Sequence, residues 1–191
     1  MTVPTRAIAG SPAEVSVEAF LVPNAYPTDA QLIDGVIVMT DATFRHQAIA
    51  GRLFIALQFW CDAAPGRGRA GFGGNWVVSE RSVVKPDAWW ISPADQPGLI
   101  GARSDVPPTI AAEVRSPRTW RLDIGRKREL YEAKGVLELW LADGVTNVLT
   151  VLHRSDAGSG LDLEQRLVPG DTLTTPLLDA FALDVGALFA P

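Results

Sequence analysis

Apolar positions alternate with polar ones along several short stretches of the chain, which is the pattern of half-buried β-strands. The clearest stretch is 31–39, where Asp34-Gly35 separates two apolar runs. This dipeptide suits the positive backbone angles of a tight two-residue turn, so the stretch predicts a β-hairpin. The other expected strands are 69–72, 76–79, 82–91, 109–115, 136–142 and 147–153, with edge strands over 162–174.

Helical spacing appears in two longer segments. From Thr43 to about Asp62, apolar side chains recur at spacings of four, three and four residues, which defines one buried face. That face consists of Ile49, Leu53, Ala56 and Trp60. A second helix is expected from Ser116-Pro117 to about Lys134, with Gly135 as its C-terminal stop. A short terminal helix is expected within 183–190.

The order of these elements is helix, several strands, helix, strands, which indicates a mixed α/β (α+β) domain. With 191 residues the chain is long enough for one domain with a substantial core, so we expect a single domain over 1–191. Residues 1–28 contain four prolines and little periodicity, so an irregular N-terminal arm is expected there. A Pro/Gly-rich loop is expected over 92–108.

Composition narrows the classes of function. The chain is 47% hydrophobic and 20% charged, which argues against disorder. Its net charge of −5 excludes a protein that grips nucleic acid over most of its surface, and leaves room only for a local positive patch. Most of the basic residues are arginines, which either suits bidentate contacts with phosphate or follows from a GC-rich genome.

Cysteine usage and hydropathy suggest the compartment. Cys61 is the single cysteine, so an internal disulfide and a thiolate metal site are excluded, and its helical setting makes it a core residue. The N-terminus lacks a basic segment followed by a long apolar run, and no stretch reaches the ~18–20 apolar residues that span a bilayer. We therefore expect a soluble cytoplasmic protein without a membrane partner.

Two acids stand inside apolar strand-like runs. Asp87 lies in 82–92 and Glu113 in 108–117, and a buried carboxylate costs several kcal/mol unless something compensates its charge. A divalent metal, an ion-pair network or an acid/base pair would each provide that compensation. Strand alternation places Lys85 and Trp89 on the face of Asp87, and Arg115 on the face of Glu113.

If the two runs are neighbouring strands, both acids come within reach of one ion. Oxygen ligands favour Mg²⁺ or Mn²⁺ over zinc. Between Arg115 and Arg128 there are six cations and one acid, a local charge of +5 that would suit a phosphate-facing patch. The structural alternative is an ion-pair network, with Glu113 paired to Arg115, and Asp123 to Lys127 at helical i, i+4 spacing.

A resemblance to a known family bears on this choice. Four motifs carry the resemblance: Pro86-Asp87, Glu113-Val-Arg-Ser-Pro117, Asp123-x-x-x-Lys127-x-x-x-Tyr131 and Gly135-Val-x-Glu-Leu-Trp-Leu-x-Asp143. The Leu32-Ile-Asp-Gly35 hairpin and Arg45-His46-Gln47 precede them and fit the same family. In this order, over roughly 30–155, they resemble the Uma2 family of the PD-(D/E)XK nuclease superfamily. The resemblance implies a restriction-endonuclease-like mixed central sheet flanked by helices, here with an N-terminal hairpin and extra C-terminal strands.

The resemblance also implies roles for individual residues. Asp87 and Glu113 would bind Mg²⁺ (or Mn²⁺), with the backbone carbonyl of Val114 as a further ligand. The superfamily often has a lysine where this chain has Arg115, which cannot act as a base because it keeps its proton. Arg115 would then give electrostatic support, and Lys127 would orient or activate water. A lysine that snorkels to the surface is the structural alternative for Lys127.

A histidine, three arginines and two tryptophans are further candidates for nucleic-acid contacts. His46 would contact phosphate or complete the site, although capping or packing would also explain a histidine there. The basic residues named for phosphate contact are Arg118, Arg121 and Arg126. Trp89 and Trp90 could stack on bases, but adjacent tryptophans face opposite sides of a strand, so at least one is expected in the core.

The chain departs from the family pattern at two positions. Gln31 and Val36 stand where family members often carry acids, which would reduce metal affinity or inactivate the site.

The resulting hypothesis is a metal-dependent endonuclease that hydrolyses phosphodiester bonds, of DNA rather than RNA. The alternative is a non-catalytic nucleic-acid-binding or assembly module on the same fold, and a homo-oligomeric scaffold without a nucleic-acid role is a third. Small restriction-type nucleases often work as dimers, so a homodimer is compatible with each of these.

Overall fold

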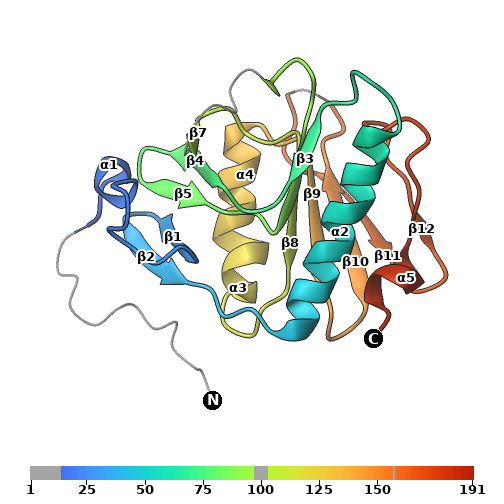
Figure 1. Cartoon of the computed structure of the whole chain (residues 1–191), viewed down its shortest axis with the longest axis horizontal. Coiled ribbons are helices and arrows are strands. Elements are labelled where there is room, and N and C mark those ends of the chain that lie inside the picture. Colours follow the sequence, from blue (N-terminus) through green and yellow to red (C-terminus); the bar gives the residue numbers. More distant parts are fainter. Residues whose placement is uncertain (1–13, 97–102, 157) are drawn as a thin grey trace.

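The computed structural model describes residues 14–96, 103–156 and 158–191. Two mixed sheets lie side by side, and helices cover both faces of the longer one (Figure 1). The helical elements are α1 (Val17–Phe20), α2 (Phe44–Asp62), α3 (Trp120–Leu122), a π-helical turn η2 (Asp123–Lys127), α4 (Arg128–Lys134) and α5 (Val185–Phe189). This is a mixed α+β fold, as the sequence pattern predicted.

The five-stranded sheet, called the hairpin sheet below, has the strand order β2-β1-β5-β4-β7. Its strands are β1 (Ala30–Ile33), β2 (Val36–Met39), β4 (Asn75–Ser79), β5 (Ser82–Val84) and β7 (Arg103–Ser104). The predicted hairpin is confirmed, because β1 and β2 pair antiparallel around Asp34 and Gly35. Both turn residues have positive φ, 51° and 81°, as a two-residue hairpin turn requires.

The six-stranded sheet, called the central sheet below, has the order β11-β10-β9-β8-β6-β3. Its strands are β3 (Arg69–Gly71), β6 (Ala88–Ile91), β8 (Ile110–Val114), β9 (Glu138–Asp143), β10 (Val148–His153) and β11 (Leu163–Leu167). β8 runs parallel to β9 and antiparallel to β6, so the strand that carries Glu113 lies beside the strand that follows Asp87. A small separate pair, β12 (Thr172–Leu173) and β13 (Leu183–Asp184), precedes α5.

Strand β8 divides the core into two layers. Ile110, Ala112 and Val114 pack on the side of α2, in one hydrophobic cluster with Leu53 and the C-terminal segment. Ala111 faces the other side, where Leu130 and Tyr131 of α4 join residues of both sheets in a second cluster. The alternation read from the sequence for 109–115 is therefore confirmed, and α2 and α4 cover opposite faces of the central sheet.

The long helix α2 begins where it was predicted. Thr43 is its N-cap, and its side-chain oxygen accepts a hydrogen bond from the His46 backbone N–H at 3.2 Å. The buried face differs in part from the predicted one, because Leu57 is buried whereas Ala56 and Trp60 are half-buried. This rotation brings His46 to the buried side of the helix, toward the hairpin sheet.

Three element predictions need correction. The run 82–91 is not one strand: β5 ends before Lys85, and β6 begins after Asp87 in the other sheet, since Pro86 has no N–H to give to a ladder. The helix predicted from Ser116 starts only at Trp120, although Gly135 does end it, in left-handed conformation. Within the predicted irregular arm 1–28, Val17–Phe20 is helical, and 1–13 lie outside the described residues.

Candidate active site

A small cavity lies where β8 ends, between the hairpin sheet, α2 and η2. Its volume is about 10 Å³, which is room for roughly one water molecule or one ion. It brings together residues that are far apart in the sequence. The lining residues are Gln31, Thr40, Ala42, His46, Asp87, Glu113, Val114, Ser116, Thr119, Asp123 and Lys127.

Asp87 reaches this cavity from the crossover between the two sheets. Its backbone N–H donates to the carbonyl of Ala112 at 2.9 Å, so the residue is tied to β8 although it precedes β6. Its Oδ2 accepts a hydrogen bond from the Val114 N–H at 2.7 Å. The carboxylate is therefore held against the strand that carries Glu113, with its side chain 23% exposed.

Glu113 is buried and bound from the opposite side by the helix. Its Oε1 lies 2.5 Å from Nζ of Lys127 and accepts a hydrogen bond of 2.5 Å from the Tyr131 hydroxyl. The Lys127 side chain is 1% exposed, so it points inward, as its predicted role at the site requires, and does not snorkel to solvent. The structural alternative predicted an ion pair between Glu113 and Arg115, and this pair is absent from the described contacts. The cation that contacts Glu113 is Lys127, and Arg115 pairs with Asp143.

The π-helical turn η2 shapes the helical wall of the cavity. It begins at Asp123 and ends at Lys127, and such wide turns occur often at functional sites. Asp123 Oδ1 lies 3.3 Å from Lys127 Nζ, and its Oδ2 accepts a hydrogen bond of 3.0 Å from the Thr119 hydroxyl. The i, i+4 pair predicted from the sequence is thus present, and the same lysine also contacts Glu113. Both contacts of Nζ are charge–charge contacts without hydrogen-bond geometry.

His46 closes the cavity on the side of α2. Its Nε2 lies 3.1 Å from Oδ2 of Asp87, and the side chain is 9% exposed. Burial lowers the pKa of His46, but the hydrogen bond and charge of Asp87 outweigh burial and raise this pKa above its ordinary value. The His46 side chain therefore lines the cavity and contacts Asp87, whereas the side chain of Thr43 caps the helix by binding the His46 backbone N–H.

The buried groups carry a surplus of negative charge. Burial raises the pKa of Glu113 to about 8, against the opposing charge of Lys127, and burial raises the pKa of Asp123 as well. Burial lowers the pKa of Lys127, but the charges of Glu113 and Asp123 raise it above its usual range. Lys127 is therefore an ammonium ion that faces three carboxyl groups, and the cluster holds a proton near neutral pH.

A divalent cation would offset this surplus in place of the proton. Among the residues that the structure describes, no three His, Cys, Asp or Glu side chains lie close enough together to hold an ion by themselves. Asp87, Glu113 and Val114 nevertheless border the same cavity. Two carboxylates and a backbone carbonyl are the hard oxygen ligands that Mg²⁺ or Mn²⁺ accepts, with water in its remaining positions. The donor set therefore fits such an ion in its chemistry.

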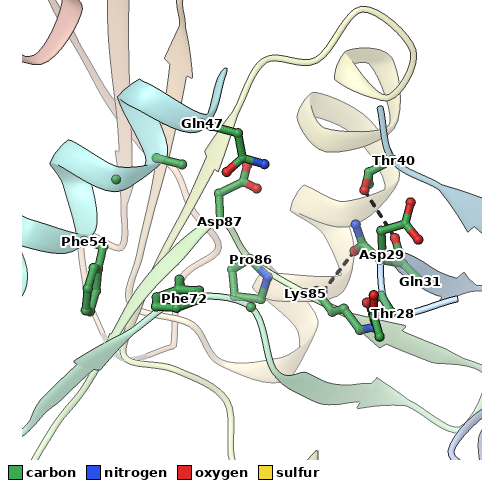
Figure 2. A pocket seen from close by; sticks show the side chains of 13 residues that line it. Thr28, Asp29, Gln31, Thr40, Gln47, Phe54, Phe72, Lys85, Pro86 and Asp87 are labelled. Atoms are coloured by element: carbon green, nitrogen blue, oxygen red, sulfur yellow. Dashed lines mark hydrogen bonds between the residues drawn. The ribbon is translucent and has the colours of Figure 1, made fainter. Parts of the chain in front are cut away.

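A wider groove of about 400 Å³ adjoins this cavity. Gln31, Thr40 and Asp87 line both, so the groove leads from solvent to the acids. Figure 2 shows Asp87 and Gln47 near the middle of the view, with Phe54 and Phe72 to one side of them and Gln31, Thr40 and Lys85 to the other. The opposite wall is formed by the hairpin sheet and by Lys85, whose ammonium donates to the Thr28 carbonyl at 2.5 Å.

The alternation predicted for Lys85, Asp87 and Trp89 is wrong, because the strand is interrupted between β5 and β6. Lys85 turns to the groove wall and Asp87 to the cavity, whereas Trp89 packs against Trp76 with ring centroids 5.1 Å apart. Trp90 is 4% exposed, which confirms that at least one of the two adjacent tryptophans lies in the core. Trp89 is half-buried, and its indole N–H donates to the Gly73 carbonyl at 3.0 Å.

The structure does not gather the basic segment 115–128 into one phosphate-facing patch. Arg115 donates to Asp143 at 2.8 Å and lies over the ring of Trp120, outside the cavity lining. Each of the other named cations faces a separate part of the surface. Arg118 lies 3.4 Å from Asp41, Arg126 binds Asp34 through both oxygens, and Arg121 is exposed. Sequence proximity had suggested a shared patch, but Arg118 and Arg126 pair with acids of the distant segment 34–41, and Arg126 also pairs with Glu129 nearby.

The two departures from the family pattern have different consequences. Gln31 is 5% exposed and lines the cavity, and its Oε1 accepts a hydrogen bond of 3.0 Å from the Lys85 backbone N–H. It therefore helps to fix the crossover that carries Asp87. Val36 is 50% exposed and is absent from the described lining of the cavity. Only the substitution at 31 bears directly on the site.

Sequence reasoning left three contributors out of the site. Asp123 and Tyr131 contact Lys127 and Glu113, and Thr119 binds Asp123. The spacing Asp123-x-x-x-Lys127-x-x-x-Tyr131 was a usable signal, because residues four apart share one face of a helix. For Thr119 no comparable pattern exists in the sequence.

None of the helices in the described part of the chain has the length and apolarity to cross a bilayer.

The fold has a counterpart among solved structures. Among solved structures, the chain is similar to a crystal structure described as "a putative nuclease belonging to DUF820" from Anabaena variabilis, with a TM-score of 0.76. The match covers 92% of this chain and 97% of that chain at 16% sequence identity, which shows the fold. A comparison with curated proteins gave no significant match.

The family follows from the sequence itself. Residues 21–186 match the model of the Uma2 family, whose description is "Putative restriction endonuclease". The match spans most of the chain and includes both acids, Lys127 and the hairpin. The chain belongs to the Uma2 family, and the expected restriction-endonuclease-like character of the fold is confirmed.

Proposed function

We propose that this protein is a metal-dependent endonuclease that hydrolyses phosphodiester bonds of DNA. The observation that carries the proposal is the convergence of Asp87, Glu113 and Lys127 on one cavity, from three separate elements. The family and the fold support a nuclease. The choice of DNA over RNA, of Mg²⁺ or Mn²⁺ as the ion, and of the cytoplasm as the compartment are our proposals.

Asp87, Glu113 and the carbonyl of Val114 would hold the ion. When bound, it would polarise a phosphoryl oxygen and make a bound water more acidic. Lys127 keeps its proton, because Glu113 and Asp123 raise its pKa, so it orients the water and stabilises negative charge on the phosphate instead of accepting a proton. Tyr131 fixes the Glu113 carboxylate through its hydroxyl, and the amide of Val114 fixes Asp87.

His46 is proposed to position Asp87 and to approach the phosphate through the groove. Arg115 is engaged with Asp143, so we propose that it supports the site at longer range. Arg118 and Arg121 are proposed to contact the nucleic-acid backbone beyond the groove. For Arg126 the double contact with Asp34 argues for a structural role instead.

The test is cleavage of DNA and RNA substrates, each with Mg²⁺, with Mn²⁺ and with a chelator. The unmodified protein should cut DNA only with the metal. Glu113→Gln should lower the rate by more than about 100-fold, since even outer-shell partners of a metal site are worth about 10–100-fold. Glu129→Gln is the matched control, because this glutamate is 66% exposed on α4 and does not belong to the described lining of the cavity. Metal-independent cleavage, or an active Glu113→Gln variant, would refute the proposal.

A second function is favoured by Gln31, which puts a neutral amide where family members often carry an acid. The protein would then be a nucleic-acid-binding or assembly module without catalysis. It would bind DNA in a salt-sensitive manner, and Asp87→Asn would bind as well as the unmodified chain. Binding that requires metal and Asp87 would contradict this reading. Gain of cleavage in Gln31→Glu would identify residue 31 as the reason for inactivity.

A further inference from the structure

Helix α2 is apolar on its outer face as well as on its buried face. The outer face carries Phe44, Ala48, Gly51, Ile55 and Phe59, called the α2 stripe below. The exposed fractions are 98% for Phe44, 49% for Ile55 and 72% for Phe59. Surface helices normally present polar residues to water, and a helix that is apolar all round is normally buried. The α2 stripe therefore has the character of an interface.

Charged side chains next to the stripe are drawn away from it. Arg45 donates to the carbonyl of Gly144 and to the Asn147 side chain, each at 2.8 Å. Arg52 donates to backbone carbonyls at the C-terminus, including that of Ala190 at 2.6 Å. Both arginines thus stabilise the fold on the side of α5. The stripe carries no charged side chain from Phe44 to Phe59, and the exposed Asp62 follows it one turn later, bound by the Gln58 side chain.

The order of large and small residues along the stripe is reciprocal. Phe44 and Phe59 are equally far from the midpoint between residues 51 and 52, and so are Ala48 and Ile55. If a second copy of α2 lies antiparallel on the first, Phe44 meets Phe59 of the other copy and Ala48 meets Ile55. Gly51 then lies at the crossing point. Within the described residues, no heavy atom lies within 4 Å of where a β-carbon of Gly51 would be.

We propose that the α2 stripe is the contact between two copies of this chain, related by a two-fold axis that passes the helix between residues 51 and 52. A two-fold interface must be self-complementary, and the reciprocal spacing meets that requirement. A glycine at the crossing allows the helix axes to approach within about 8–10 Å.

The apolar area that the stripe offers sets the strength of this dimer. Phe44, Phe59 and Ile55 offer on the order of 350–500 Å² per copy, since one aromatic side chain buries about 150–250 Å². Two copies would bury about 700–1,000 Å² before the flanking residues are added, against roughly 1,200–2,000 Å² for stable complexes. The dimer should therefore dissociate on dilution.

This arrangement has a consequence for the groove beside α2. Gln47 and Phe54 line that groove and lie about 90° round the helix from the stripe, and Gly51 of the stripe borders the groove as well. A two-fold axis perpendicular to two antiparallel helices keeps this side of both copies on the same side of the dimer. Both grooves, each leading to an Asp87, then open in the same direction. Resting on the proposed function, the inference is that one dimer cuts both strands of a duplex.

Sedimentation as a function of concentration tests the contact. The unmodified chain should dimerise, and Phe59→Glu should weaken the dimer at least about tenfold, the equivalent of about 1.4 kcal/mol. Phe44→Lys should do the same, and the double variant Phe44→Lys/Phe59→Glu should restore the dimer through an ion pair between copies. Val145→Glu, at a 77% exposed position on the turn after β9, should leave the dimer unchanged. Circular dichroism confirms that each variant is folded.

Crosslinking tests the register. Gly51→Cys should form a disulfide between two copies under mild oxidation, because the residue meets its own copy at the two-fold axis. Val36→Cys, at a 50% exposed position, and the unmodified chain with Cys61 should not. A monomer at every concentration, or a dimer that Phe59→Glu leaves intact, would overturn the proposal. Crosslinking through Val36→Cys but not Gly51→Cys would also overturn it.

Plasmid cleavage then separates the dimer from the chemistry. The unmodified protein should convert supercoiled plasmid to linear DNA, and Phe59→Glu should yield mainly nicked circles. A dimer that uses the stripe but cuts nothing would refute the nuclease and leave the interface in place. A monomer that cuts DNA would refute the interface and leave the nuclease proposal in place.

Discussion

Removal of the buried ammonium is the sharpest test of the electrostatic account of the site. Lys127 and Glu113 are 1% and 3% exposed, and their charged atoms lie 2.5 Å apart. Lys127→Met keeps the length of the side chain and removes its charge. Glu113 and Asp123 are then left without their cation, and breaking a buried pair in this way costs about 3–5 kcal/mol. For a chain of this size the melting temperature should fall by roughly 6–20 °C.

The pH dependence of this variant has a definite sign. Burial already raises the pKa of Glu113 to about 8 and that of Asp123 above its ordinary value. Without Lys127 both pKa values should rise further, so the acids become neutral at low pH and their burial costs less there. The loss in unfolding free energy should therefore be small at pH 6 and grow as the pH rises through 8.

Urea unfolding followed by tryptophan fluorescence measures the effect, since the chain has six tryptophans. The double variant Lys127→Met/Glu113→Gln should recover much of the loss, because neutral partners replace the ion pair. Arg121→Met is the control, because this cation is exposed on the same helical segment. If Lys127→Met lowers the unfolding free energy by less than about 1 kcal/mol at pH 8, then Lys127 is hydrated in the unmodified protein and the reasoning fails.

Two further predictions concern the core and the metal. Gly71→Ala should cost about 1–3 kcal/mol, because a β-carbon there would lie 2.2 Å from the ring of Trp89, which Trp76 holds in place. Gly125→Ala, which meets nothing within 4 Å among the described residues, should stabilise by about 0.5–1 kcal/mol; equal effects in urea titrations would contradict this packing. Mg²⁺ affinity, measured by calorimetry, should rise with pH through about 8, because Glu113 must lose its proton to bind an ion. An affinity that is flat from pH 6 to 9 would exclude Glu113 as a ligand.

Local patterns predicted the elements that depend on nearby residues. The Asp34-Gly35 turn, the helix start at Thr43 and the stop at Gly135 each follow from chemistry within a few positions, and all three are confirmed. The alternation along β8 was also correct. In each case the structure adds tertiary contacts to a preference that the local sequence already has.

Features set by distant contacts escaped prediction. The run 82–91 is mostly apolar, and although Pro86 can interrupt a strand, the sequence does not show that the two halves join different sheets. The partners of the arginines are equally remote: Arg126 binds an aspartate 92 positions earlier, in the hairpin turn. For the site, motif order identified Asp87, Glu113 and Lys127 as candidates. The wide turn η2, which aims Asp123 and Lys127 at Glu113, is a property of the folded helix.

The position of Asp87 depends on both sheets, because this residue lies in the crossover between them. One anchor is the amide of Gln31, which holds Lys85 from the hairpin sheet, and the other is β8 of the central sheet. The distance between Asp87 and Glu113 therefore depends on how the hairpin sheet packs against the central sheet. If Asp87 and Glu113 bind a metal ion as proposed, substitutions under the hairpin could change metal selectivity without a change in either acid.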